Sequence, residues 1–399
     1  MTYRDATVGV VIPAYNEEAF VGDVIAGLPS FVDRVYPVDD RSTDGTWDAI
    51  REAADGANRR RPPAEGFDRV VVPLRHEENR GAGGAALTGY RAALEDGVDV
   101  VASLDGDDQM DPAFLPSLLD PVVEGTAAYA KGDRLASREY VREMSRWRLF
   151  GNLLLTGLTR VASGYWRLRD PQNGYTVISA DVLDRLDLDR LYEQYGFRND
   201  VLVHLNVAGH RVADVPHPAR YGDETSGIAY SSFVPNLSLL LARRFLWRLA
   251  RQAADGEYGP AASFVAGAAG VGGAARSWLA SAARPRAPWR SPVASDGGRA
   301  AGSAGATRSL VGFVLGVALL CLGSVLDARR RSGSVVRVPA DADRDGAHED
   351  WPSPDAASRP DDGRARTGSR DGDGRPDDDA DGGRPADVDD ATDRQLDAD

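Results

Sequence analysis

Residues 103–112 read SLDGDDQMDP and close the apolar run Val98–Leu104. An apolar run of this length that ends in polar residues predicts a buried strand. The run stops in four carboxylates within seven positions, which are Asp105, Asp107, Asp108 and Asp111. Open α/β sheets bind their ligands outside the carboxyl ends of the strands. The stretch therefore predicts a sheet and a ligand site at one edge of it.

Short apolar runs alternate with helix-like segments over residues 1–225. This alternation predicts an α/β fold with a mostly parallel sheet and flanking helices. The expected strands are 7–12, 34–38, 69–74, 98–104, 127–132, 174–179 and 212–216. The expected helices are 17–28, 46–54, 83–94, 112–123, 144–162, 180–187 and 200–208.

The net charge of −14 is concentrated in the last part of the chain. Residues 341–399 hold 20 acidic residues and 8 arginines, so they carry −12 and the preceding 340 residues are nearly neutral. Lys131 is the single lysine among 47 cationic side chains. Such a composition is typical of a halophile, and an arginine-biased genome explains the lysine deficit as well. No basic stripe stands out, so nucleic acid is not an expected partner.

The composition changes again after residue 225. Residues 226–255 place Leu, Phe and Trp with Arg at helical spacing, which predicts a basic amphipathic helix at 233–250. Such a helix suits a membrane interface, and it could equally pack on its own domain. The Ala/Gly-rich residues 256–308 are typical of a linker, in which 260–275 is a possible weak membrane segment.

Residues 309–326 are 18 uncharged, mainly apolar residues with arginines on both sides, and they predict a transmembrane helix. The acidic, aromatic-poor residues 327–399 should be a disordered tail. The N-terminus has no signal-peptide pattern, so we expect the catalytic part on the cytoplasmic side of the cell membrane. A single span would leave Arg329–Arg331 outside, so we expect 260–275 to pair with 309–326 as a hairpin, and a single span is the alternative.

The acids after Leu104 are candidate metal ligands. Asp105 and Asp107 are separated by one residue, so both can face one cation, and the amide oxygen of Gln109 can join them. A ligand set made only of oxygen favours Mg²⁺ or Mn²⁺ over zinc. Two other interpretations compete with a metal site. One is a solvated acidic turn, and the other is a dinucleotide fingerprint in GAGGAA (81–86).

Polar segments follow the first two expected strands as well. VVIPAYNEE (10–18) ends the first strand, and VDDRSTDGT (38–46) ends the second. Three of the first four strand ends thus carry side chains able to hold a base, a ribose and a metal-bound diphosphate. In these segments the sequence resembles family 2 glycosyltransferases of the GT-A (Rossmann-like) fold. Within that family it is most similar to the dolichyl-phosphate mannose and glucose synthases of archaea, over about residues 8–230.

The resemblance implies a role for individual residues. Substrate-binding roles in the donor site fall on Pro13, Tyr15, Glu17, Asp40 and Asp105. The metal ligands would be Asp105, Asp107 and Gln109, with Asp107 also counted as catalytic. Arg41 departs from the small residue that often follows the paired acids, which leaves the positioning of the base open.

Acceptor-side motifs also match. Gly132-Asp133-Arg134 stands for the family's Gly-Ser-Arg, and DPQNGYTVIS (170–179) resembles its acceptor segment. RYGDETSG (220–227) resembles the segment whose arginine meets phosphate, which implies phosphate contacts for Arg134 and Arg220. In YGFRND (195–200), Asp200 takes the base position of relatives with alcohol acceptors, and its alternative use is a helix N-cap.

The resemblance implies an inverting, metal-dependent hexosyltransferase. Its partners would be a GDP- or UDP-linked sugar donor, a polyprenyl (dolichyl) phosphate acceptor and membrane lipid, and its product would serve protein or surface glycosylation. One alternative is a glycosyltransferase that extends a lipid-linked or surface glycan at a hydroxyl. An inactive, membrane-tethered nucleotide-sugar binding module is an alternative of another class.

Overall fold

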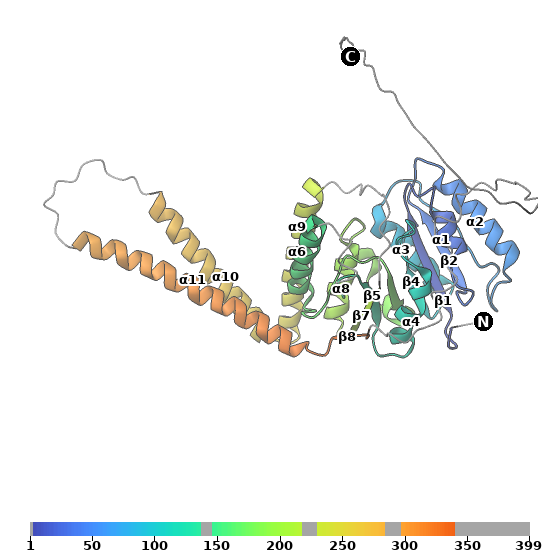
Figure 1. Cartoon of the computed structure of the whole chain (residues 1–399). Helices are drawn as coiled ribbons and strands as arrows, with labels where there is room; N and C mark the ends of the chain where they lie inside the picture. Colours follow the sequence, from blue (N-terminus) through green and yellow to red (C-terminus); the bar gives the residue numbers. More distant parts are fainter. Residues whose placement is uncertain (1–2, 137–145, 218–229, 284–296, 340–399) are drawn as a thin grey trace, which may run out of the picture. The chain divides into compact units, whose positions relative to one another are not determined.

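A single sheet of eight strands organises the chain (Figure 1). The computed structural model describes residues 3–136, 146–217, 230–283 and 297–339. The strand order is β3-β2-β1-β4-β6-β5-β7-β8, and β6 is antiparallel to both of its neighbours while all other pairs are parallel. The expected mostly parallel sheet is therefore confirmed. The strands are β1 (Val8–Ala14), β2 (Arg34–Asp39), β3 (Leu74–Arg75), β4 (Val100–Ser103), β5 (Tyr129–Asp133), β6 (Thr176–Ser179), β7 (Val212–Pro216) and β8 (Val335–Arg337).

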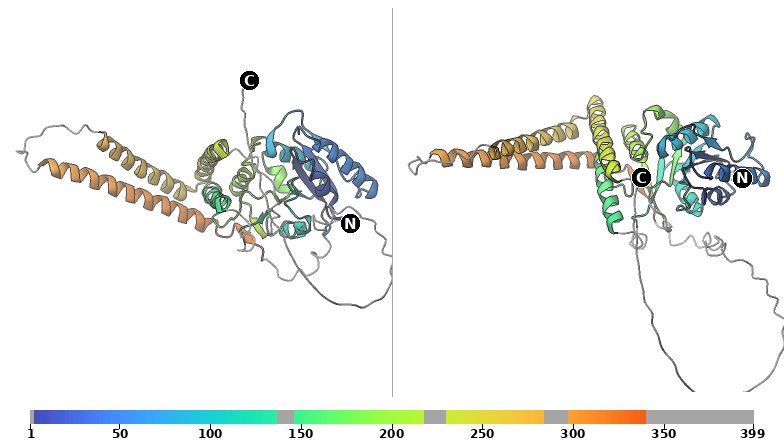
Figure 2. Two further views of the ribbon diagram at one scale, coloured as in Figure 1. Left: turned by 45° about the horizontal axis from the view of Figure 1, so that its top comes forward. Right: turned by 90° about the horizontal axis from the view of Figure 1, so that it is seen from above.

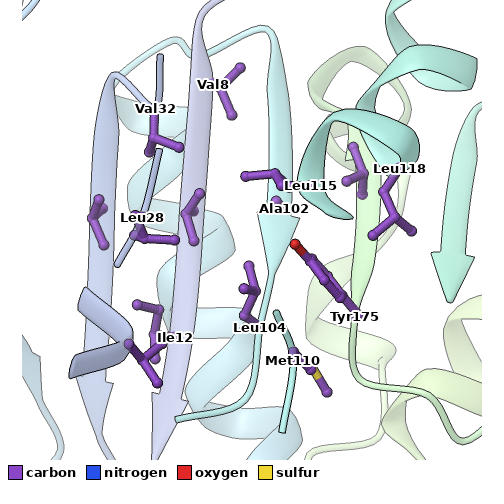
Figure 3. Packing of buried hydrophobic residues seen from close by; sticks show 14 of the residues in the cluster. Val8, Ile12, Leu28, Val32, Ala102, Leu104, Met110, Leu115, Leu118 and Tyr175 are labelled. Atoms are coloured by element: carbon purple, nitrogen blue, oxygen red, sulfur yellow. The ribbon is translucent and has the colours of Figure 1, made fainter. Parts of the chain in front are cut away.

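Helices cover both faces of this sheet. One face packs against α1 (Val21–Ala26), α2 (Thr46–Arg60) and α4 (Leu115–Val123), through the cluster of Val, Ile and Leu side chains in Figure 3. The other face packs against α3 (Gly81–Glu95), α7 (Ala180–Arg185) and α8 (Phe197–Val207). Short 3₁₀ turns lie at Pro112–Phe114 and Leu188–Arg190. Alternate residues of β1 serve the two cores, since Val10 and Ile12 join the first and Val11 joins the second.

The two edge strands differ from the sequence prediction. The strand expected at 69–74 is mostly absent as a regular strand: Val70 and Val72 bond to Val35, and the ladder is then interrupted at Pro73, which has no amide hydrogen to donate. At the other edge, β8 was not expected at all. It follows the last helix and pairs in parallel with β7.

The amphipathic segment forms α9 (Tyr230–Ala254), which packs on its own domain along one face. Leu237 and Leu241 are buried against α8 and against α6 (Arg146–Ser163). For this face, the interpretation that the helix packs on its own domain therefore holds. Leu239 and Leu246 on α9 are exposed, at 51% and 64%. A membrane contact by these exposed side chains stays a prediction.

The linker expected at 256–308 is wrong for its described part, which is helical. Tyr258–Ala282 form α10, and Gly297–Arg330 form α11, which lies beside it (Figures 1 and 2). A Cβ on Gly267 would stand 2.8 Å from the Gly316 carbonyl oxygen, and one on Gly316 would stand 2.7 Å from the Val271 nitrogen. The glycines therefore allow two backbones to approach, which composition alone does not distinguish from a linker.

By length and composition, Ser309–Arg330 of α11 could cross a membrane, and it is the one helix among the described residues that meets both criteria. The last turn of α11, around Asp327, is called the hairpin foot below, and a buried ion pair joins it to α9. Both carboxylate oxygens of Asp327 accept from the Arg248 guanidinium, at 2.9 and 3.0 Å, and neither side chain is exposed. The disordered tail expected at 327–399 is wrong for its first part, because these residues end α11 and form β8. The tail from residue 340 onward lies outside the described residues.

Candidate active site

The carboxyl ends of β1, β2 and β4 meet at one edge of the sheet, as the three polar segments predict. The Asp40 amide donates to the Ala14 carbonyl oxygen at 2.9 Å, and the Gly106 amide donates to the Pro13 carbonyl oxygen at 3.3 Å. The end of β1 thus lies between the paired acids after β2 and the acids after β4. Pro13 itself is buried, so its contribution to this edge is backbone shape.

The segment after β1 braces the segment after β2. The Asn16 side-chain oxygen accepts from the Thr43 amide at 2.9 Å, and the Glu17 amide donates to the Thr46 hydroxyl at 2.8 Å. Asn16 has a φ of +58°, a region that Asn tolerates better than most residues. Tyr15, next to it, is 48% exposed. The two predicted donor-binding segments therefore form one unit, with the Tyr15 ring at its surface.

Asp40 has a different setting from the one its predicted role requires. It is 2% exposed, and its carboxylate accepts from the amides of Arg80 and Gly81, at 2.8 and 2.7 Å, and contacts His76 Nδ1 at 2.7 Å. These protein groups occupy both carboxylate oxygens. Asp40 thus fixes the start of α3 beside the site, and direct contact with a nucleotide stays a prediction.

The acids after β4 lie at the centre of this edge. The carboxylate of Asp105 contacts the guanidinium of Arg198, from the first turn of α8. Asp107 Oδ1 accepts from the Gln109 amide at 3.2 Å, which closes a local turn, and Asp108 follows with a φ of +57°. The side chains of this segment are all partly exposed, namely Asp105, Asp107, Asp108 and Gln109.

Gly174 lies directly against the Asp105–Arg198 pair. A Cβ at this position would stand 2.2 Å from Asp105 Oδ2 and 2.6 Å from Arg198 Nη2, so any larger residue would displace the ends of these two side chains. The acceptor-side segment 170–179 thus reaches the predicted metal ligands. Burial opposes the charge on Arg198, but Asp105, then Tyr129 and Tyr90, outweigh it and hold the pKa of Arg198 above its usual value.

The two acceptor-side motifs meet at the ends of β5 and β7. Arg134 donates to both oxygens of Asp170, at 2.7 and 2.9 Å. Burial would raise the pKa of Asp170, yet the charge and hydrogen bonds of Arg134 hold it well below its usual value. Next to them, Lys131 pairs with Asp214 at 2.9 Å, and both are buried. Arg220, the other predicted phosphate contact, lies outside the described residues.

Asp200 is turned away from this edge. It is fully buried in the first turn of α8 and pairs with Arg244 of α9 at 2.6 Å, while its other oxygen accepts from the Tyr192 amide. The N-cap of α8 is Gly196, so the alternative prediction of an N-cap is wrong. The base role stays a prediction for which this geometry gives no support.

A divalent cation fits the residues that are present. Among the described residues, no group of three or more His, Cys, Asp or Glu side chains is arranged to hold a metal. The predicted ligands Asp105, Asp107 and Gln109 could offer two carboxylates and an amide oxygen, and this ligand set stays a prediction. Mg²⁺ binds in this way, through one or two carboxylates and substrate phosphates, and Mn²⁺ prefers the same ligands. Arg198 already holds a positive charge against one of the carboxylates.

Sequence reasoning missed Arg198 and Gly174 as site residues. Both lie in segments that were singled out, YGFRND and DPQNGY, but only Asp200 in the first was given a role. The signal in the sequence that could have identified this role is Arg198 itself, a cation two residues before the predicted base Asp200.

Comparisons with known proteins confirm the predicted family resemblance. The sequence profile of Glycosyl transferase family 2 matches residues 9–187. A UDP-N-acetylglucosamine–dolichyl-phosphate N-acetylglucosaminyltransferase from Methanococcus voltae is 27% identical over 53% of this chain and 85% of its own length. An undecaprenyl-phosphate mannosyltransferase from Micrococcus luteus is 30% identical over 52% of this chain and 80% of its own. The Mycobacterium tuberculosis glucosyl-3-phosphoglycerate synthase, solved with Mg²⁺ and UDP, aligns over 61% of this chain and 80% of its own, with a TM-score of 0.43 and 20% identity.

Proposed function

The chain belongs to the family 2 glycosyltransferases, and from this premise we propose that it transfers a hexose, with inversion, from a nucleotide sugar to a polyprenyl phosphate. The donor is GDP- or UDP-linked, and the acceptor is of the dolichyl type. The relatives from Methanococcus voltae and Micrococcus luteus are named for dolichyl and undecaprenyl phosphate, which supports this choice of acceptor. The lipid-linked sugar then serves protein or surface glycosylation.

The observation that carries the choice of acceptor is the burial of Asp200. A hydroxyl acceptor needs a general base to remove its proton, but Asp200 is buried and paired with Arg244. A phosphate monoester carries about −1.5 to −2 near neutral pH. Its oxygen can therefore attack without a base, and the site described here needs none.

Each residue of the edge has a role in this reaction. Asp105, Asp107 and Gln109 would hold a divalent cation, which would neutralise the charge that builds on the departing nucleoside diphosphate. Tyr15 and Glu17 bound the donor site, and Asp40 fixes the start of α3 beside it. Arg134, held in orientation by Asp170, offers its planar guanidinium to phosphate oxygens, and Arg220 does the same.

Transfer assays on membranes test this proposal. Labelled GDP- and UDP-hexoses are supplied with dolichyl phosphate, and in parallel with a glycan that offers only hydroxyl groups. We expect metal-dependent labelling of the lipid phosphate and no labelling of the glycan. Labelling of the glycan alone would assign the chain to glycan extension. Nucleotide-sugar binding without transfer to either acceptor would make it an inactive binding module.

The catalytic domain faces the cytoplasm, and α10 and α11 cross the membrane together as a hairpin. At about 1.5 Å per residue, the 25 residues of α10 reach about 37 Å and the 22 residues of Ser309–Arg330 about 33 Å, enough for a core of about 30 Å. The chain leaves the domain after α9 and returns to it in β8, which pairs with β7. Both ends of the hairpin thus stay on one side.

Accessibility in sealed, right-side-out vesicles tests this topology. With Cys321 replaced by serine, a single cysteine at Ser281, near the far end of α10, should react with an impermeant maleimide from outside. A tag at the C-terminus should resist added protease until the vesicles are opened. A C-terminal tag digested from outside would replace the hairpin by a single span.

A further inference from the structure

Arg198 and Asp105 form an ion pair at one of the predicted metal ligands. The Arg198 guanidinium contacts one oxygen of Asp105, and Gly174 leaves room for the other oxygen beside its backbone. Both side chains are partly exposed, at 23% and 30%. A divalent cation at Asp105 therefore arrives next to a positive charge already paired with its ligand.

Asp105 is the acid that neutralises Arg198. The groups that favour the charged guanidinium are Asp105 and the hydroxyls of Tyr129 and Tyr90. Burial raises the pKa of both tyrosines above the usual value, so they stay neutral and the carboxylate of Asp105 is the counter-charge. Arg198 also lines a small pocket with these two tyrosines, Ser103 and Thr176. If a metal took Asp105 alone, the guanidinium would lose its counter-charge in a largely desolvated place, which is costly.

Arg198 is also fixed at its backbone. It follows Gly196, whose φ of +116° suits glycine, and Phe197, which packs in the core under α3. Its Cα therefore cannot move far while α8 stays folded. The guanidinium can exchange one anion for another within reach, but it cannot leave the site.

We propose that Arg198 makes metal binding depend on the donor diphosphate. This inference rests on the proposed function, because it assumes a metal-assisted donor site. Without nucleotide, Arg198 competes with the cation for Asp105 and weakens its binding. When a nucleoside diphosphate binds, its phosphates replace Asp105 as the negative partner of Arg198, and Asp105 becomes available to the cation. Cation and nucleotide therefore bind cooperatively. The coupling is reciprocal, so each ligand raises the affinity for the other.

Mn²⁺ affinity, measured by electron paramagnetic resonance on the full chain in detergent, tests the proposal without a reaction. We expect Mn²⁺ to bind the unaltered chain at least about tenfold more tightly with saturating GDP or UDP, the order of effect of one nearby charge. In Arg198→Gln, Mn²⁺ alone should bind about tenfold more tightly than in the unaltered chain, and the added effect of nucleotide should shrink. Arg198→Lys keeps the charge and should keep the coupling.

Arg91→Gln serves as the matched control, because it also removes one guanidinium, here one that pairs with the exposed Asp189. It should leave both Mn²⁺ affinities unchanged. If Arg198→Gln matches the unaltered chain with and without nucleotide while transfer activity is present, the inference is overturned and the proposed function stands. If Arg198→Lys loses the coupling as fully as Arg198→Gln, charge is not the cause, which overturns it as well. An unaltered chain that binds no Mn²⁺ with either nucleotide and transfers no sugar overturns both.

Discussion

Two arginine–aspartate pairs, one at the sheet edge and one at the foot of the hairpin, use the same chemistry in opposite settings. Arg198 contacts one oxygen of Asp105, and both side chains are partly exposed. Arg248 meets both oxygens of Asp327, and both side chains are fully buried. The comparison therefore separates an ion pair that can be exchanged from one that holds the structure.

The number of additional partners makes the difference. Asp327 also accepts from Trp166 Nε1 at 2.9 Å, and Arg248 donates to the carbonyl oxygens of Val161 and Ala162. Nearly every donor and acceptor of that pair is satisfied inside the protein, so no ligand can improve on the arrangement. The pair at the sheet edge leaves Asp105 Oδ2 beside the Gly174 backbone, where a cation can reach it.

Removing a carboxylate at the sheet edge should give the largest effect, on rate alone. Asp107→Ala deletes a partly exposed ligand and no core packing, so transfer should fall by about 10²–10³-fold, the order found on removing one electrostatic contact to a transition state. Initial rates and the urea unfolding midpoint, measured on the same preparation, check this. Asp108→Asn in the same turn is the control, because Asn tolerates its φ of +57°. An active Asp107→Ala enzyme would contradict the metal site.

Breaking the pair at the hairpin foot should affect stability alone. Asp327→Asn leaves Arg248 as a buried, uncompensated charge, and the free energy of unfolding should fall by about 3–5 kcal/mol. The double variant Arg248→Met with Asp327→Leu should regain most of this loss. Denaturant unfolding in micelles measures both. Arg251→Met, at an exposed arginine of the same helix, should change stability by about 0.5 kcal/mol or less. A rate loss per folded molecule in Asp327→Asn would give this pair a functional role.

The sequence predicted the sheet well where strands are long and central. β7 has the predicted bounds, and the ends of β1, β2 and β4 converge as expected. It failed where a segment depends on a distant partner. β8 is three residues long and exists through its pairing with β7. The sequence of α10 resembles a linker because its many glycines lower helix propensity. The reason for these glycines is the close contact with α11, which a local pattern does not show.

The site was predicted in part for a similar reason. The ligand positions Asp105 and Asp107 follow from a local pattern, and they lie where that pattern predicts. The helix expected from Asp200 begins instead at Phe197, and this places Arg198 in its first turn, facing Asp105. Asp200 forms an ion pair with Arg244, 44 residues further along the chain. Helix boundaries and long-range partners are what a local pattern determines least.

Asp133 is intermediate between the two pairs, since it is buried and its ion pair with Arg169 is long. Arg169 lies 3.8 Å away, and burial raises the pKa of Asp133 to about 6. The folded chain therefore binds more protons than the unfolded chain between about pH 4 and pH 6, so stability falls as pH rises through this window. Asp133→Asn should remove this fall and be more stable at pH 7.5 by about 3 kcal/mol, at ~1.4 kcal/mol per pKa unit. Urea unfolding from pH 4 to 7.5 checks it, and parallel curves for the two proteins would contradict it.

The smallest effect should come from cutting the chain after Pro339, which leaves both ion pairs and β8 in place. The residues removed are acidic and poor in apolar side chains, a composition that cannot pack on a folded domain, so rate and stability should equal those of the full chain at matched salt. Cutting after Gly333 is the informative control, because it also removes Val335, which is buried against β7, and Val338, which packs on the core. This shorter chain should unfold at lower denaturant and hold its hairpin foot less firmly, while its Mn²⁺ binding at Asp105 stays unchanged. A loss of activity already at the first cut would mean that the acidic residues act on the sheet edge, and the separation of the two regions would fail there.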